Sequence, residues 1–190
     1  MASKTARNVL KKRLYFVNSH KIIVMKKVLV VLLVAFIIIQ FFRIDKTNPA
    51  PTPQMDFLTI KSTPESTAKL IRTSCYDCHS NESVYPWYSN IQPVGWFLLN
   101  HIKDGRKALN FSNFATYDPL MQAKKLNKAA HEVSDGGMPI ESYLLIHQDA
   151  KLTDAQKKEM ADYFTKVKTQ IMQDHQLTDD QVNAKPQKRD

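Results

Sequence analysis

The residues best suited to chemistry in this sequence are the five from Cys75 to His79, which read Cys-Tyr-Asp-Cys-His. A C-x-x-C-H run is the attachment signature of c-type haem. Two thiols one helical turn apart can each add to a vinyl group on one edge of a porphyrin, and the histidine that follows can offer an imidazole nitrogen to the iron. The chain has no other cysteine. The motif therefore predicts one covalently bound haem c, attached through Cys75 and Cys78 and ligated by His79.

Three other interpretations of the cysteine pair were weighed. A redox dithiol is expected in a βαβ context, and no strand-like run precedes Cys75. A structural zinc site needs four ligands at close spacing, and no second C-x-x-C or H-x3-5-H follows. A chance match is the third alternative. Haem attachment is the interpretation that the spacing favours.

Two residues downstream are candidates for the sixth ligand of the iron. Met138 lies between glycine and proline in the run Gly136-Gly137-Met138-Pro139, and its thioether suits haem iron. His101 is the second candidate, and an open or water-bound position is the third. His/Met ligation is the prediction.

Helices must position these groups. Only 4 glycines and an apolar fraction of 43% fit a mostly helical protein. Taken with the C-x-x-C-H motif and the apolar run near the N-terminus, the expected fold is all-α, a small cytochrome c-like helical domain behind an N-terminal transmembrane helix. Thr63-Pro64-Glu65 predicts the N-cap, the first residue and an acidic first turn of the helix that carries the motif. Further helices are predicted over 94–109, from Asp118-Pro119 to about Val133, and after a capping box in 153–156. The last of these should bury Met160, Phe164, Val167 and Ile171.

The helix over 94–109 should present one inward stripe: Val94, Phe97, Leu98, His101, Ile102, Gly105 and Ala108. On this helix, Arg106 and Lys107 either pair with haem propionates or form an exposed charged pair. The aromatic loop 81–93 either contacts the porphyrin or is core. His131 and His147 are expected to be structural, and three lysines of the next helix to form a solvated face: Lys124, Lys125 and Lys128.

The net charge of +9 is concentrated near the start of the chain. Residues 1–27 hold eight of the 27 basic residues and no acidic one, so the remainder, with 19 basic and 18 acidic residues, is nearly neutral. This distribution indicates a membrane flank and argues against nucleic-acid binding. An apolar run follows, and no small-residue cleavage pattern comes after it, which favours an uncleaved anchor over a signal peptide. The positive-inside rule then places residues 1–27 in the cytoplasm and the following domain in the periplasm.

The predicted organisation has five parts. A basic cytoplasmic leader covers 1–27, within which 1–24 are a candidate for an upstream start because Met25-Lys26-Lys27 resembles a natural start. A transmembrane anchor covers 28–43, and a proline-containing linker covers 44–63. The haem c-binding domain covers 64–172, and a polar, frayed tail covers 173–190.

Several segments together resemble one family. They are Cys75-Tyr76-Asp77-Cys78-His79-Ser80-Asn81, Tyr85-Pro86-Trp87-Tyr88-Ser89, Asn100-His101-Ile102 with Gly105-Arg106, Gly137-Met138-Pro139, and Ser142-Tyr143-Leu144-Leu145-Ile146-His147. This set looks like the bacterial haem-binding domain family of small membrane-anchored, cytochrome c-like proteins, over roughly residues 58–169. The resemblance implies a covalently bound haem in an extracytoplasmic domain, with Cys75, Cys78 and His79 in the attachment and ligand positions. It supplies no substrate or redox partner.

Three functions follow from a single haem. The first is a one-electron carrier at the inner membrane, facing the periplasm, and this is preferred over an enzyme. The second is a small peroxidase-like enzyme with an open iron position and His101 as a distal base. The third is a sensor in which a ligand displaces Met138 or His101.

Overall fold

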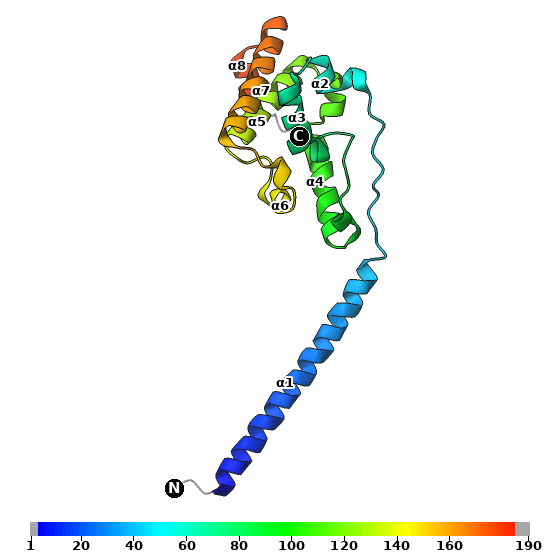
Figure 1. The fold of residues 1–190 in the computed structure, drawn as a ribbon, viewed down its shortest axis with the longest axis vertical. Helices are drawn as coiled ribbons and strands as arrows, with labels where there is room; N and C mark the ends of the chain where they lie inside the picture. Colours follow the sequence, from blue (N-terminus) through cyan, green and yellow to red (C-terminus); the bar gives the residue numbers. More distant parts are fainter. Residues whose placement is uncertain (1–3, 185–190) are drawn as a thin grey trace. The chain divides into compact units, whose positions relative to one another are not determined.

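The computed structural model describes residues 4–184, with side chains from residue 21 onward. Every regular element in this range is helical, which confirms the predicted all-α class (Figure 1). The α-helices are α1 (Lys4–Ile39), α2 (Phe57–Ile60), α3 (Glu65–His79), α4 (Val94–Ala108), α5 (Pro119–Ser134), α6 (Glu141–Leu144), α7 (Asp154–Asp174) and α8 (Asp179–Asn183). Four short 3-10 turns accompany them: η1 (Pro53–Met55), η2 (Trp87–Asn90), η3 (Phe111–Thr116) and η4 (Gln148–Ala150).

The chain forms two compact units. The first combines residues up to Ile44 with the segment Trp87–Trp96. Its helix α1 contains one stretch, Lys21–Ile39, that is long and apolar enough to cross a membrane, and none of its residues is buried. The helix ends at Ile39, before the end of the anchor predicted over 28–43, and its apolar part begins earlier than predicted.

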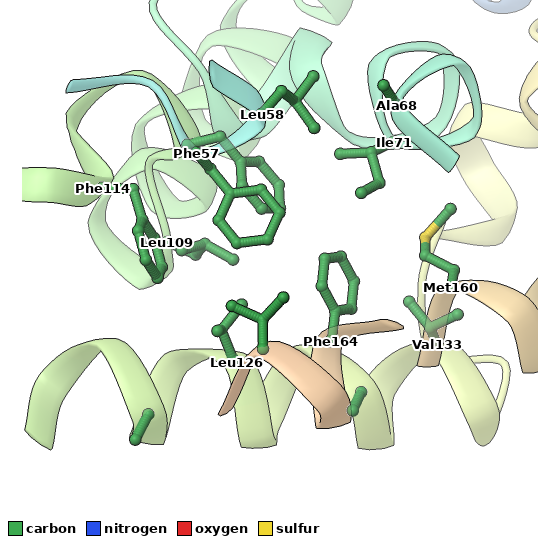
Figure 2. Close-up of a cluster of buried hydrophobic side chains, with 14 of the residues drawn as sticks. Phe57, Leu58, Ala68, Ile71, Leu109, Phe114, Leu126, Val133, Met160 and Phe164 are labelled. Carbon is green, nitrogen blue, oxygen red and sulfur yellow. The ribbon is translucent and has the colours of Figure 1, made fainter. Parts of the chain in front are cut away.

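The second unit, residues 45–86 and 97–184, contains the hydrophobic core. Helices α5 and α7 pack against each other along their length, and α3 packs against α7. Phe57 is fully buried, and its ring centroid lies 5.3 Å from that of Phe111 and 4.9 Å from that of Phe114. Figure 2 shows Phe57 beside Phe114. The four residues predicted to face the core from the last long helix are all buried: Met160, Phe164, Val167 and Ile171.

Local capping signals identified two helix starts correctly. Asp118 accepts a hydrogen bond from the Met121 amide at 2.9 Å, and Thr153 forms the predicted capping box with Gln156. Helix α3 begins one residue later than predicted, because Pro64 is extended and acts as N-cap. The Thr63 hydroxyl instead accepts a hydrogen bond from Tyr163 at 2.8 Å.

The structure differs from expectation at α4 and near the C-terminus. Of the predicted α4 stripe, only Ile102 and Gly105 are buried, whereas Phe97 is exposed and its ring lies 4.1 Å from that of His101. Within the segment predicted to be a frayed tail, α8 has its own capping box and buries Val182. Its C-cap residue, Ala184, accepts a hydrogen bond from Lys124 of α5.

Candidate cofactor-binding site

The cysteine motif forms the last turn of α3. Cys75 and Cys78 are three residues apart and therefore lie on one face of the helix. Both thiols are free and partly buried. His79 is the last helical residue and is likewise partly buried. The helix thus gives the three groups the spacing that attachment and ligation require.

The two residues between the cysteines anchor this turn to the rest of the domain. The buried Tyr76 hydroxyl donates to both carboxylate oxygens of Asp56, at 2.8 and 3.0 Å, and the Tyr76 ring stacks on Phe111. Asp77 accepts hydrogen bonds from the Tyr143 hydroxyl at 2.6 Å and from the Val84 amide at 3.1 Å. Desolvation raises the pKa of Tyr76 and of Tyr143, and the neighbouring carboxylates act in the same direction. Both phenols therefore remain hydrogen-bond donors at neutral pH.

Replacing Tyr76 with phenylalanine is expected to lower the free energy of unfolding by about 1.5–3 kcal/mol, the range for hydrogen bonds to charged groups. The ring packing on Phe111 would persist, while the buried carboxylate of Asp56 would keep only the Leu58 amide as a partner. Urea unfolding of the full chain in detergent, followed by circular dichroism, measures the change. The matched control is Tyr85→Phe at a partly exposed tyrosine. Equal losses in both variants would show that the Asp56 contact is not responsible.

The imidazole of His79 is oriented for ligation. Its Nδ1 lies 2.9 Å from the Leu109 carbonyl oxygen, which can only accept, so Nδ1 carries the proton and donates. Nε2 is then the unprotonated nitrogen that a metal can bind. Burial lowers the pKa of His79 below its usual value and outweighs the opposing effect of backbone hydrogen bonds to Leu109 and Gly105. The neutral, ligating form of the ring is therefore favoured.

The two thiols do not have the character of a redox pair. Burial raises the pKa of Cys75 to about 12, with a contribution from Cys78, and raises that of Cys78 to about 11, with a contribution from Asp77. Reactive Cys-x-x-Cys dithiols have a lowered pKa. Among the side chains that the structure describes, residues 21–184, no three His, Cys, Asp or Glu gather in a way that could hold a metal ion.

Gly105 of α4 allows close approach to the motif. A Cβ atom at this position would lie 2.5 Å from the backbone carbonyl oxygen of Cys78 and 3.2 Å from its side chain. A contact under 3.0 Å with backbone cannot be relieved by rotating a side chain. The absence of a side chain at Gly105 is therefore what lets α4 pack against the last turn of α3.

Gly105→Ala is expected to destabilise the domain by about 1–3 kcal/mol, as overpacking does. Helix propensity alone predicts a gain of about 1 kcal/mol for the same change, so the sign of the effect separates the two causes. The urea midpoint of the full chain in detergent tests this. Lys107→Ala, at an exposed position of the same helix, serves as control and should leave the midpoint nearly unchanged. A more stable Gly105→Ala variant would contradict the packing argument.

Two adjoining cavities, called here the larger and the smaller lobe, lie beside the motif. Their volumes are about 270 and 210 Å³, and the lining of each is mainly apolar. Five residues line both lobes: Ser74, Cys75, His79, Ala108 and Met138. Apolar cavities with a few fixed polar groups are the usual form of cofactor sites. A macrocycle attached at Cys75 and Cys78 would have apolar walls available, and His79 would offer a ligand at the same place.

The structure brings Met138 and the motif together. Met138 lies far from His79 in the sequence, yet it lines both lobes and packs against the core. Its amide donates to the Glu132 carbonyl at 2.9 Å, which fastens the loop to the end of α5. Gly136 has φ +75, and a Cβ at Gly137 would lie 2.5 Å from the Glu132 carboxylate. The positive φ of Gly136 thus allows the turn that delivers the thioether to the cavities, whereas the Glu132 side chain could move away from a Cβ at position 137.

The second ligand candidate, His101, lines the smaller lobe only. Its Nδ1 lies 2.9 Å from the Phe97 carbonyl oxygen within α4 and therefore donates to it. Its Nε2 is consequently also unprotonated in the neutral ring. Both candidates for the sixth ligand line the cavities. Met138 lines both lobes, as His79 does, whereas His101 lines one.

The charged residues are distributed differently from what the sequence suggested. Arg106 donates to the Ser80 carbonyl at 2.7 Å, to Asn48 at 2.7 Å and to Ser83 at 2.9 Å, so it holds the loop after the motif. The three lysines predicted to form a solvated face, Lys124, Lys125 and Lys128, all line the larger lobe. Lys128 is exposed as predicted, whereas Lys124 and Lys125 are half-buried. Burial, together with the charge of Lys128, lowers the pKa of Lys125.

Several groups that orient the cysteine motif were not predicted from the sequence. The Leu109 carbonyl that orients His79 carries no side-chain signal at all. Asp77 and Tyr143 had a weak sequence signal, since both lie in segments that carry the resemblance to the haem-binding domain family. In the aromatic loop, Asn81, Ser83, Ser89 and Gln92 are buried, whereas Trp87 is exposed. None of Tyr85, Trp87 and Tyr88 lines either lobe, so contact of this loop with a porphyrin stays a prediction.

A comparison with protein families gives one match. A family model described as a haem-binding domain matches residues 34–166, a range that contains the cysteine motif, His101 and Met138. No curated protein and no solved structure matches the chain. The family model covers more than half of the sequence and agrees with the groups that the structure brings together around the two lobes. The chain belongs to the haem-binding domain family.

Proposed function

We propose that this protein carries one haem c, attached through Cys75 and Cys78 and ligated by His79 and Met138, and that it works as a one-electron carrier. A haem held in this way supplies a reversible one-electron couple. The protein's own contribution is to bind the macrocycle, fix both ligands and limit the access of water.

One observation carries the proposal. The Nδ1 proton of His79 is committed to the Leu109 carbonyl, so Nε2 is the nitrogen available to iron, beside two thiols on the same helical turn. Outer contacts of this kind orient metal-binding histidines and set their tautomer. The Phe111 ring, 6.4 Å from the imidazole and tilted by 66°, further restricts its rotation.

Met138 favours a carrier over an enzyme. A thioether beside both lobes provides a sixth ligand that fills the iron coordination, and His/Met ligation raises the reduction potential. Lys124, Lys125 and Lys128 provide cations along the larger lobe for the carboxylates of the porphyrin. These lysines replace Arg106 as the candidates for that role, because Arg106 lines neither lobe.

We further propose that the Lys21–Ile39 stretch of α1 anchors the protein in the inner membrane, with the haem domain in the periplasm. Its 19 residues are close to the ~20 needed to span a bilayer. The basic residues before it favour a cytoplasmic location for the N-terminal side. This orientation suits covalent attachment, which requires reduced thiols and haem to meet outside the cytoplasmic membrane.

The test combines redox titration with a competing ligand. The full chain, matured with periplasmic haem-attachment machinery, should titrate as one reversible one-electron couple and should show a low-spin spectrum in both states. Its ferrous form should not bind carbon monoxide, because Met138 occupies the sixth position. A high-spin spectrum with rapid carbon monoxide binding and peroxide turnover would overturn the carrier proposal and favour the peroxidase-like alternative with His101 as base.

A further inference from the structure

The segment Trp87–Trp96 is held against the outer end of α1, within the first unit. Gln40 is the one polar residue in the apolar run from Val28 to Phe42. Its side-chain Nε2 donates to the Gln92 carbonyl at 3.0 Å, and its Oε1 accepts from the Gln92 amide at 2.8 Å. The indole Nε1 of Trp96 donates to the Phe42 carbonyl at 2.8 Å. Three hydrogen bonds thus join the segment to residues 40–42.

The segment is built compactly around this junction. The Gln92 side chain accepts from the Trp96 amide at 3.1 Å. A Cβ at Gly95 would lie 2.4 Å from the Ser89 carbonyl oxygen and 2.8 Å from the Gln92 side chain. Gly95 is therefore needed for the turn to close, and Gln92 is fully buried within it.

The exposed surface of the segment is uncharged and mainly apolar, with Asn90 as its exposed polar side chain. None of its ten residues, Trp-Tyr-Ser-Asn-Ile-Gln-Pro-Val-Gly-Trp, is charged. Trp87 is 72% exposed, Val94 42% and Ile91 37%, and Phe41 at the end of α1 is 81% exposed. Single exposed apolar residues are ordinary, but a set of them gathered at the end of an apolar helix indicates a contact surface.

The length of the apolar helix identifies the partner. Nineteen helical residues rise about 28 Å, close to the hydrocarbon thickness of ~30 Å, so residues 40–42 fall at the membrane–water interface. Tryptophan and tyrosine are enriched at that depth, where their rings are apolar and their polar groups remain hydrated. We infer that Trp87–Trp96 is a second membrane contact: an interfacial aromatic segment that the Gln40–Gln92 pair clamps to the anchor and whose partner is the lipid headgroup layer. This inference rests on the anchoring part of the proposed function.

The two tryptophans of the chain both lie in this segment, which makes a direct test possible. The full haem-loaded chain is labelled with fluorotryptophan and placed in nanodiscs of phosphatidylcholine and phosphatidylglycerol. Fluorine NMR of the diamagnetic ferrous form assigns the resonances by means of Trp87→Phe. The Trp87 resonance should be lost to broadening when doxyl-labelled phosphatidylcholine is included and should persist with a water-soluble gadolinium chelate. The opposite pattern would overturn the inference.

A matched variant tests the clamp itself. Gln40→Leu keeps the helix apolar and the side chain similar in size but removes both bonds to Gln92. It should make the Trp87 resonance sensitive to gadolinium while the haem spectrum stays unchanged, and unaltered shielding would show that Gln40 does not hold the segment. Flotation of the chain with liposomes separates the two proposals. A chain that fails to float overturns the anchor and this inference together, whereas a chain that floats with Trp87 open to gadolinium overturns only this inference.

Discussion

The double variant Cys75→Ala, Cys78→Ala is expected to retain no haem after denaturation, even when it is produced with periplasmic haem-attachment machinery. The two thiols are the only ones in the chain, and they lie one turn apart on the last turn of α3. Without them, nothing can form a thioether bond to the porphyrin. A haem-stained denaturing gel together with the visible spectrum measures the loss. Each single variant should keep a haem with one unreacted vinyl group, and its absorption bands should shift to longer wavelength because that vinyl stays conjugated with the ring.

The matched control for this experiment is Ser74→Ala. Ser74 lines both lobes, and its hydroxyl donates to the Ala150 carbonyl at 3.1 Å, so the substitution changes the same surroundings without removing a thiol. It should leave haem attachment intact. Haem that stays bound to the double variant through denaturation would contradict the assignment of these cysteines.

Met138→Ala is expected to lower the midpoint potential by on the order of 100 mV or more, since axial ligands alone set haem potentials over a range of ~0.8 V. Met/His ligation gives the higher potentials, so the shift should be downward. The ferrous variant should also bind carbon monoxide, which the parent should not. Potentiometric titration and ligand-binding spectra measure the two effects independently.

Two further variants make the Met138 result specific. Met121→Ala changes an exposed methionine of α5 that lines neither lobe, and it should leave the potential unchanged. His101→Ala should likewise keep the low-spin spectrum. If His101→Ala opened the iron and Met138→Ala did not, the sixth ligand would be His101, and the carrier would have His/His ligation.

Much of the fold was readable from short stretches of sequence because the signals are local. The caps at Asp118 and Thr153 depend on contacts three residues away, and the stripe that buries Phe164 depends on the period of one helix. The cysteine motif is equally local, since its chemistry requires only that one helical turn separate two thiols. The family resemblance, drawn from several such segments, is confirmed by the family match.

The errors came from contacts between distant segments. The lysine face of α5 is only partly solvated: Lys128 is exposed as predicted, whereas Lys124 and Lys125 are half-buried beside a cavity that residues of α3 also line. The α4 stripe was expected to be buried throughout, but only Ile102 and Gly105 meet the rest of the domain closely. Periodicity shows that a helix has an apolar face and does not show what covers it.

Some features of the site have no sequence signature. The carbonyl of Leu109 sets the tautomer of His79, and every residue has a carbonyl. Gln40 is the one polar residue of the apolar run from Val28 to Phe42, and its amide pairs with the backbone of Gln92, 52 positions along the chain. In both cases the partner is the backbone of a distant residue, which only the folded arrangement identifies.

The most direct test of the account is the intact mass of the full-length protein after maturation by periplasmic haem-attachment machinery, measured under denaturing conditions. The account predicts a polypeptide heavier than the bare chain by the mass of one haem, with that added mass retained on the tryptic peptide that contains Cys75 and Cys78. A polypeptide of unmodified mass, with both thiols still free to react with an alkylating reagent, would contradict it.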